Sequence, residues 1–337
     1  MDINKRIKYI DMLKFLAIFA VIFLHAYKID STIMIGGHNF YKLRAFIDFG
    51  VPLFLMVTGA LALNKDIDLR VFFKKKIVRI CLPLAFYFMI SYFLGVHKNP
   101  LISFWYSWMI IGAYFAVPLV NKIIQNSTMR EIEYFVAMII VTSIFYSLSY
   151  FLNFEFSLDL NFFITPISYI VIGYYLSKRE LNMSYNKLII ISLIIYVAFS
   201  IIKMKVGLLT AIYPRFNLSG VIDLGIFEII QVSSVFLIFR CLYDNHADKF
   251  KHIRGFLERD IINRFIVSVS RSTYGMFFIH AIIFQAFLYP FVRNLHISNV
   301  KIFMIVILSA IGGLFISWIL TWLLSRIPYV KYFVGYA

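Results

Sequence analysis

The residues best suited to chemistry lie within YIDMLKFLAIFAVIFLH, an apolar stretch that contains Asp11, Lys14 and His25. On a helix that turns by about 100° per residue, Lys14 and His25 return to within about 20° of each other, and Asp11 lies about 40° from His25. The three side chains therefore share one stripe. Ionisable groups inside a membrane are costly and usually face a cavity or a polar pathway. A neutral histidine there can accept a hydroxyl proton, although a hydrogen bond between helices is its commoner role.

A second polar feature is the basic run FFKKKIVRICLP, residues 72–83. At i, i+3 spacing on an α-helix, Lys76 and Arg79 face the same way, and Lys75 lies beside them. Such a cation pair suits a phosphorylated ligand, of which coenzyme A is an example. Lipid headgroups and topology signals account for similar clusters, so charge alone does not identify the ligand.

Further ionisable residues lie in later apolar stretches, and they include His280 and Arg271 in one stretch and Glu228 in another. We expect Glu228 to be protonated, or paired with a cation such as Arg271 or Arg215. These four residues are candidates for substrate contact or structural support. The sequence contains no nucleophile elbow, P-loop or paired-histidine metal motif, so we expect no metal.

Composition indicates the fold that must position these residues. Of 337 residues, 61% are hydrophobic and only 15% are charged, which is too apolar for a soluble core. We predict an all-α, polytopic integral membrane protein with about ten transmembrane helices. The net charge of +16 then reflects loop charges rather than a nucleic-acid partner. The expected spans are 10–28, 46–63, 80–97, 103–121, 134–152, 161–177, 188–205, 223–242, 273–292 and 302–325.

Loop charges predict the orientation of these spans. If the N-terminus is cytoplasmic, most loop lysines and arginines lie inside, including the clusters at residues 65–79 and 244–264. The positive-inside rule supports this orientation and places both termini in the cytoplasm. Glycine and proline in GVPLFLMVTGALAL, residues 50–63, permit either close helix packing or an unwound substrate entry, and packing is the commoner reason.

Read in order, these segments resemble the acyltransferase type 3 family of bacterial integral membrane acyltransferases. YIDMLKFLAIFAVIFLH is similar to the family's leading signature, and VPLFLMVTGALAL to its second-span pattern, with Thr58 where serine is commoner. KKKIVRICLP is similar to its basic-x-x-Arg motif, with Lys76 in place of the commoner arginine. Later segments that resemble the family are FWYSWMIIGAYFAVPL, IVIGYYLS, STYGMFFIHA and SRIPYVKYFVG.

The resemblance implies O-acyl transfer, most often of an acetyl group, from cytoplasmic acetyl-CoA to a hydroxyl of a cell-surface or lipid-linked glycan. The setting would be the bacterial cytoplasmic (inner) membrane, in contact with membrane lipids. We expect one transmembrane acyltransferase domain over residues 1–337 with no appended soluble domain. The acceptor would then bind directly, or the acyl group would pass to a separate partner, and a homo-oligomer stays open.

The resemblance also implies roles for the residues singled out above. His25 would be the general base, on a route lined by Asp11 and Lys14, while Lys76, Arg79 and Lys75 would hold the donor's phosphates. A covalent acyl-enzyme on Thr58 or Ser270 stays open, but direct transfer is favoured because neither hydroxyl has an evident base beside it.

Two other functions fit part of the pattern. Many spans, glycines within them and buried polar groups also suit a transporter of polysaccharide, lipid-linked intermediates or amino acids, although no inverted repeat is visible. A sensor or scaffold for envelope assembly would use the basic loops only for lipid contact. Dependence on acyl-CoA separates the enzyme from both.

Overall fold

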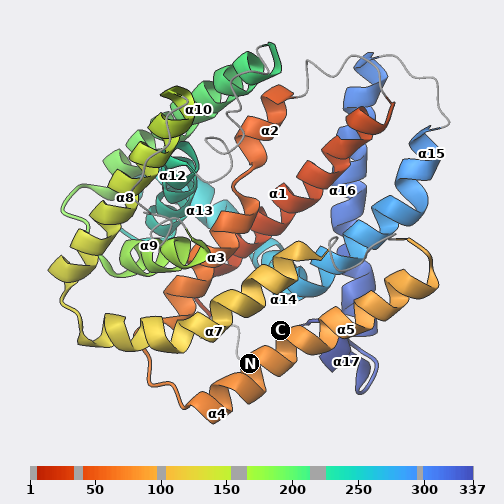
Figure 1. Cartoon of the computed structure of the whole chain (residues 1–337), viewed down its shortest axis with the longest axis horizontal. Coiled ribbons are helices and arrows are strands. Elements are labelled where there is room, and N and C mark those ends of the chain that lie inside the picture. Colours follow the sequence, from red (N-terminus) through yellow and green to blue (C-terminus); the bar gives the residue numbers. More distant parts are fainter. Residues whose placement is uncertain are drawn as a thin grey trace. The chain divides into compact units, whose positions relative to one another are not determined.

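The computed structural model describes residues 6–33, 41–96, 104–152, 165–212, 225–293 and 299–336, and every regular element in these ranges is a helix (Figure 1). Within this part of the chain, eight helical segments are long and apolar enough to cross a membrane. The prediction of an all-α polytopic membrane protein is confirmed. The segments are Lys8–Tyr27, Arg44–Ala62, Leu69–Phe93, Trp105–Asn126, Met129–Ser149, Tyr185–Val206, Asp260–Val292 and Met304–Leu324.

Each of these eight segments overlaps one of the ten expected spans. The other two expected spans, 161–177 and 223–242, correspond to α9 (Pro166–Lys178) and α12 (Ile226–Leu242). These helices have 13 and 17 residues, fewer than a typical membrane span requires. Each is preceded by a described N-cap residue, Thr165 for α9 and Gly225 for α12.

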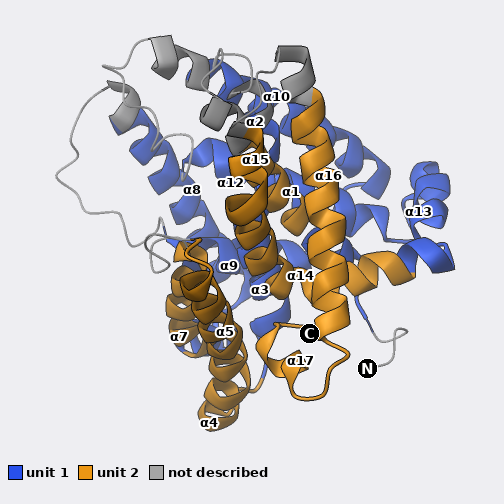
Figure 2. Cartoon of the chain, turned by 90° about the vertical axis from the view of Figure 1, so that its right-hand side faces the viewer, with its two compact units in different colours: residues 1–14, 41–65, 119–263 blue, residues 15–40, 66–118, 264–337 orange. Residues whose placement is uncertain are grey.

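The chain divides into two compact units, which Figure 2 distinguishes by colour. In three helices the sequence passes from one unit to the other partway along the helix. These helices are α1 (Lys8–Ile33), α7 (Trp105–Asn126) and α14 (Asp260–Ile283). Unit 1 consists of residues 1–14, 41–65 and 119–263, and unit 2 consists of residues 15–40, 66–118 and 264–337.

Unit 1 is a set of helices in which α10 packs on α12 and α2, and α3 packs on α9. Local sequence fixes where some of them begin. Thr128 and Glu131 form reciprocal hydrogen bonds at the start of α8, because Glu131 accepts from the Thr128 backbone and Thr128 Oγ1 accepts from the Glu131 backbone. Besides α9 and α12, the helices of this unit are α2 (Tyr41–Ile47), α3 (Gly50–Ala62), α8 (Met129–Leu152), α10 (Tyr185–Ile212), η4 (Asp248–Phe250) and α13 (Lys251–Leu257).

Helices α3 and α9 approach closely because each has a glycine at the contact. A Cβ atom on Gly59 would overlap the Ile170 carbonyl, and one on Gly173 would overlap the Met56 backbone. Small residues allow helix backbones to approach in this way inside membranes. Because α3 is one unbroken helix, Gly59 serves close packing rather than local unwinding.

We therefore expect Gly59→Ala to destabilise unit 1. The added methyl group meets a backbone carbonyl, which cannot move aside as the end of a flexible side chain can, and overpacking of this kind typically costs about 1–3 kcal/mol. Thermal unfolding of the purified protein in detergent measures the effect. Gly112→Ala is the matched control because its Cβ atom meets no atom within 4 Å. Equal melting temperatures for the two variants would contradict this account of the α3–α9 contact.

Unit 2 contains two long helical rods, each widened by a π turn. In the first, the π turn η2 (Phe73–Ile77) joins α4 (Leu69–Phe72) to α5 (Val78–Phe93). In the second, η5 (Phe284–Leu288) joins α14 to α15 (Tyr289–Arg293). Such turns recur at functional sites. The unit also contains α16 (Asn299–Leu324) and α17 (Val330–Phe333), and α17 packs on α5.

Candidate active site

His25 lies on α1, which is helical throughout, as the sequence predicts. Its ring is half-buried, and Nδ1 lies 2.9 Å from the Val21 carbonyl oxygen. A carbonyl oxygen only accepts hydrogen bonds, so Nδ1 carries the proton and, in the neutral ring, Nε2 carries the lone pair. The backbone at this position is held as well, because the Tyr289 hydroxyl donates to the His25 carbonyl oxygen at 2.7 Å. The local structure thus selects the tautomer that a general base needs.

His280 on α14 lies beside His25 in unit 2. The two imidazole ring centres are 4.9 Å apart, and the rings are nearly perpendicular. His280 is fully buried, and its Nδ1 donates to the Met276 carbonyl oxygen at 2.8 Å, so its neutral ring also has the lone pair on Nε2. From the sequence, His280 was expected only to contact substrate or support the structure. The fold instead places its ring beside that of His25, in the same tautomer. A histidine pair can accept and pass on a proton.

Asp11 and Lys14 belong to the part of α1 that lies in unit 1. The Arg6 guanidinium pairs with the Asp11 carboxylate, and Nε donates to Oδ2 at 2.9 Å. Arg6 was not among the residues singled out from the sequence. Asp11 is buried and Lys14 is half-buried.

The expected donor cations, Lys75, Lys76 and Arg79, are exposed. The lysines lie in the π turn η2, and Arg79 lies in α5. The π turn ends at Ile77, so the step from Lys76 to Arg79 crosses from π to α geometry, and the shared face of the two cations stays a prediction. The cations still lie within one short segment of the same rod.

Arg79 and a second arginine, Arg271, both contact Tyr336. The Arg79 guanidinium donates to the Tyr336 carbonyl oxygen at 3.4 Å, and the Arg271 guanidinium lies 5.1 Å from the centre of the Tyr336 ring. Two cations from α5 and α14 therefore contact one residue. Sequence reasoning noted the SRIPYVKYFVG segment only as a family resemblance and assigned Tyr336 no role.

The segment that carries Tyr336 is fixed by its neighbours in unit 2. The Tyr87 hydroxyl donates to the Val334 carbonyl oxygen at 3.4 Å. Gly335 has φ of +71°, a conformation that a side chain would strain, and a Cβ atom on it would lie 2.8 Å from the Tyr274 ring. Gly275 lets the same segment approach, since a Cβ atom there would overlap the Val334 carbonyl.

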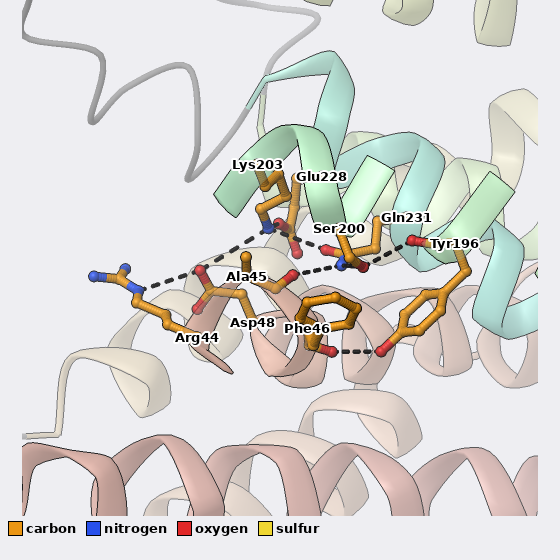
Figure 3. Close-up of polar contacts among 9 residues, drawn as sticks. All are labelled: Arg44, Ala45, Phe46, Asp48, Tyr196, Ser200, Lys203, Glu228 and Gln231. Atoms are coloured by element: carbon orange, nitrogen blue, oxygen red, sulfur yellow. Dashed lines mark hydrogen bonds and ion pairs between the residues drawn. The ribbon is translucent and has the colours of Figure 1, made fainter. Parts of the chain in front are cut away.

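Glu228 lies in a polar cluster of unit 1. Its carboxylate pairs with the ammonium of Lys203 on α10, and the side chains are 2% and 0% exposed (Figure 3). Lys203 Nζ also donates to Gln231 Oε1 at 3.0 Å and lies 3.9 Å from Asp48 Oδ2. Arg44, on the exposed side, pairs with Asp48 at 3.3 Å. Glu228 is thus paired with a cation, which is one of the two states expected for it, and the cation that the described residues supply is Lys203.

The amide of Gln231 connects this cluster to the helix backbones around it. Gln231 Nε2 donates to the Ala45 carbonyl oxygen and to Ser200 Oγ, both at 2.6 Å. Ser200 Oγ in turn donates to the Tyr196 carbonyl oxygen at 2.7 Å (Figure 3). Residues of α2, α10 and α12 are thereby joined in one network. Its burial and closely matched partners are typical of a structural network.

The remaining predicted residues have simpler settings. Thr58 Oγ1 donates to the Phe54 carbonyl oxygen at 2.9 Å, a bond within its own helix. Ser270 is buried on α14. Arg215 lies outside the described residues. In the described part of the chain, no group of three or more histidine, cysteine or acidic side chains is arranged to hold a metal ion.

Fold and site together define an all-α multi-pass membrane protein with a histidine pair inside one of its units. A sequence model described as an acyltransferase domain matches residues 7–322. The chain therefore belongs to the acyltransferase type 3 family, as predicted, and is a membrane acyltransferase. Neither curated proteins nor solved structures give a match.

Proposed function

We propose that the protein is an O-acyltransferase that moves an acetyl group from cytoplasmic acetyl-CoA to a hydroxyl of a cell-surface or lipid-linked glycan, in the bacterial cytoplasmic membrane. The observation that carries this proposal is the state of His25. Its Nδ1 proton is committed to the Val21 carbonyl, which leaves Nε2 as the basic nitrogen, and the His280 ring lies beside it.

In the proposed reaction, His25 Nε2 accepts the proton of the acceptor hydroxyl as its oxygen attacks the thioester carbonyl carbon. The carbon–sulfur bond then breaks, and the proton passes from the imidazole to the departing thiolate. Protons balance, so the enzyme returns to its starting state after each transfer. Thr58 does not need to act as a nucleophile, and its hydroxyl bond within α3 gives it no base.

The cations of unit 2 fit a phosphorylated donor. Arg79 and Arg271 contact Tyr336 together, and Lys75 and Lys76 are exposed one turn earlier in the same rod as Arg79. Guanidinium groups bind phosphate oxygens through paired hydrogen bonds, and lysines supply point charges. The Tyr336 contacts would hold Arg79 and Arg271 in place before the donor arrives, which reduces the entropy lost on binding.

We expect Arg79→Ala to raise the KM for acetyl-CoA by about 10- to 100-fold, because a hydrogen bond to a charged group contributes about 1.5–3 kcal/mol. The purified protein in lipid vesicles, supplied with radiolabelled acetyl-CoA and crude envelope glycan, provides the assay. Arg70→Ala, which removes another exposed arginine from α4 of the same rod, is the control. Unchanged donor kinetics in Arg79→Ala would refute this donor site, and wild-type protein that transfers no acyl group across several donors and acceptors would refute the function.

A further inference from the structure

Unit 2 contains an apolar groove to which the proposed reaction assigns no role. Its volume is about 450 Å³, within the range of roughly 300–1,000 Å³ that small-molecule sites occupy. One wall comes from the end of α14, from η5 and from α15, and the other wall comes from α16. The residues that define it best are Phe284, Phe287, Phe291, Leu308, Gly312 and Ile316.

Two adjacent glycines of α16 shape the groove differently. A Cβ atom on Gly313 would lie 2.6 Å from the Phe284 ring and 3.2 Å from Ile22, so α16 packs tightly there. A Cβ atom on Gly312 would meet no atom within 4 Å. Gly313 thus belongs to the packed floor, while Gly312 borders open space that a larger side chain would fill.

The floor of the groove adjoins the histidine pair. The Phe284 ring centre is 5.9 Å from that of His280, which is 4.9 Å from that of His25. The same rod holds the backbone of His25, because Tyr289 of α15 donates to its carbonyl oxygen. The Phe284 ring therefore lies between the groove and the histidine pair, so a chain in the groove would end within a few residues of the proposed base.

The other side of the groove opens toward hydrocarbon. Phe287, Phe291 and Leu308 are 68%, 65% and 64% exposed, although they lie in or at the end of segments apolar enough to span the membrane. Exposed apolar side chains at such positions contact lipid tails. An occupant would enter from the bilayer, and an acetyl group, with its single methyl, would leave nearly all of the groove empty.

We propose that this groove binds the hydrocarbon chain of a lipid-linked acceptor and so presents the acceptor's hydroxyl-bearing head to His25. The inference rests on the proposed function and narrows its acceptor to the lipid-linked class. Specificity would then depend on a chain in the groove as well as on the sugar. Gly312 keeps the groove open, and a larger residue at this position selects against acceptors with a long chain.

The first test measures binding without catalysis. Full-length protein in phosphatidylcholine vesicles is photolabelled with dodecyl glucoside that carries a diazirine at the end of its chain. We expect labelling of peptides from residues 283–292 and 305–316, which line the groove. In Gly312→Leu this labelling should fall by about tenfold. Gly112→Leu is the control, because it adds the same side chain to open space on α7, and its labelling should not change. If a phosphatidylcholine with the same diazirine labels these peptides as strongly as dodecyl glucoside does, the groove holds ordinary bilayer lipid only, and the proposal is overturned.

The second test measures transfer to dodecyl glucoside and to methyl glucoside, which have the same head. We expect the wild type to prefer the dodecyl acceptor and Gly312→Leu to lose that preference while keeping its rate with methyl glucoside. Ile316→Trp, which narrows the groove from its exposed side, provides a second variant if Gly312→Leu does not fold. Equal rates with both acceptors would overturn the groove proposal and leave the acyltransferase standing. Labelling of the groove together with no transfer to any of several acceptors would instead refute the proposed function, and with it the acceptor role of the groove.

Discussion

Replacing His25 with alanine is expected to lower kcat for acyl transfer by about 10²- to 10⁴-fold, the usual contribution of a positioned general base. The Nδ1 hydrogen bond to Val21 fixes the ring so that Nε2 is basic, and alanine removes that nitrogen altogether. The fold should survive, because this hydrogen bond closes within α1 itself and the side chain is only half-buried. The assay is acetyl transfer by purified protein in vesicles, with kcat and KM measured separately.

Two further variants distinguish the loss of a basic nitrogen from a loss of folded protein. His25→Gln retains polar atoms of similar reach but has no basic nitrogen, so it should be as inactive as His25→Ala. His252→Ala, which removes an exposed histidine of α13, should match the wild type. Thermal unfolding of all three should agree. Full activity in folded His25→Ala protein would eliminate His25 as the base and shift attention to its neighbour, His280.

Replacing Lys203 with methionine is expected to cause a large loss of stability. Lys203 and Glu228 are almost completely buried, and Asp48 lies 3.9 Å from the same ammonium group. Removing one partner of a buried ion pair typically costs about 3–5 kcal/mol, because the remaining charge has lost its compensation. The melting temperature of purified protein in detergent should fall well below that of the wild type.

A double variant tests whether the loss of stability comes from the uncompensated charge of Glu228. Lys203→Met with Glu228→Leu leaves neither charge behind, so it should recover much of the lost stability, as exchange of buried pairs for apolar side chains often does. Lys205→Met is the matched control, since Lys205 lies on the same helix but is exposed. A Lys203→Met protein as stable as this control would show that the network in Figure 3 contributes nothing.

The membrane class and most of the helices were predictable because hydropathy is a local property of the sequence. All ten expected spans have helical counterparts, eight of them long enough to cross a membrane, and α1 has the helical form on which the shared stripe depends. The π turn at Phe73–Ile77 was not predictable, since its residues give no local signal that distinguishes it from an α turn. Lys76 lies within this turn, whereas the predicted pairing with Arg79 assumed a regular α-helix.

Contacts between distant segments were the part of the candidate site that local reasoning could not supply. His25 and His280 had both been singled out, but nothing in their spacing predicts rings that lie 4.9 Å apart. Lys203 is different, because a signal was available: a lysine inside the expected span 188–205 needs a partner, and Glu228 lies in the next span. The arginines given as examples of that cation, Arg271 and Arg215, lie farther along or outside this pair of spans.

The Lys203–Glu228 pair also has a consequence for how the protein is made. Its two residues lie on α10 and α12, which follow one another among the described helices and pack together. A helix that enters the bilayer alone with an unpaired charge carries a cost of up to about 2.5–3.5 kcal/mol, the value for the centre of the bilayer. When α10 and α12 enter the bilayer together, Lys203 and Glu228 neutralise each other, so we expect this helix pair to be the unit of insertion for the region.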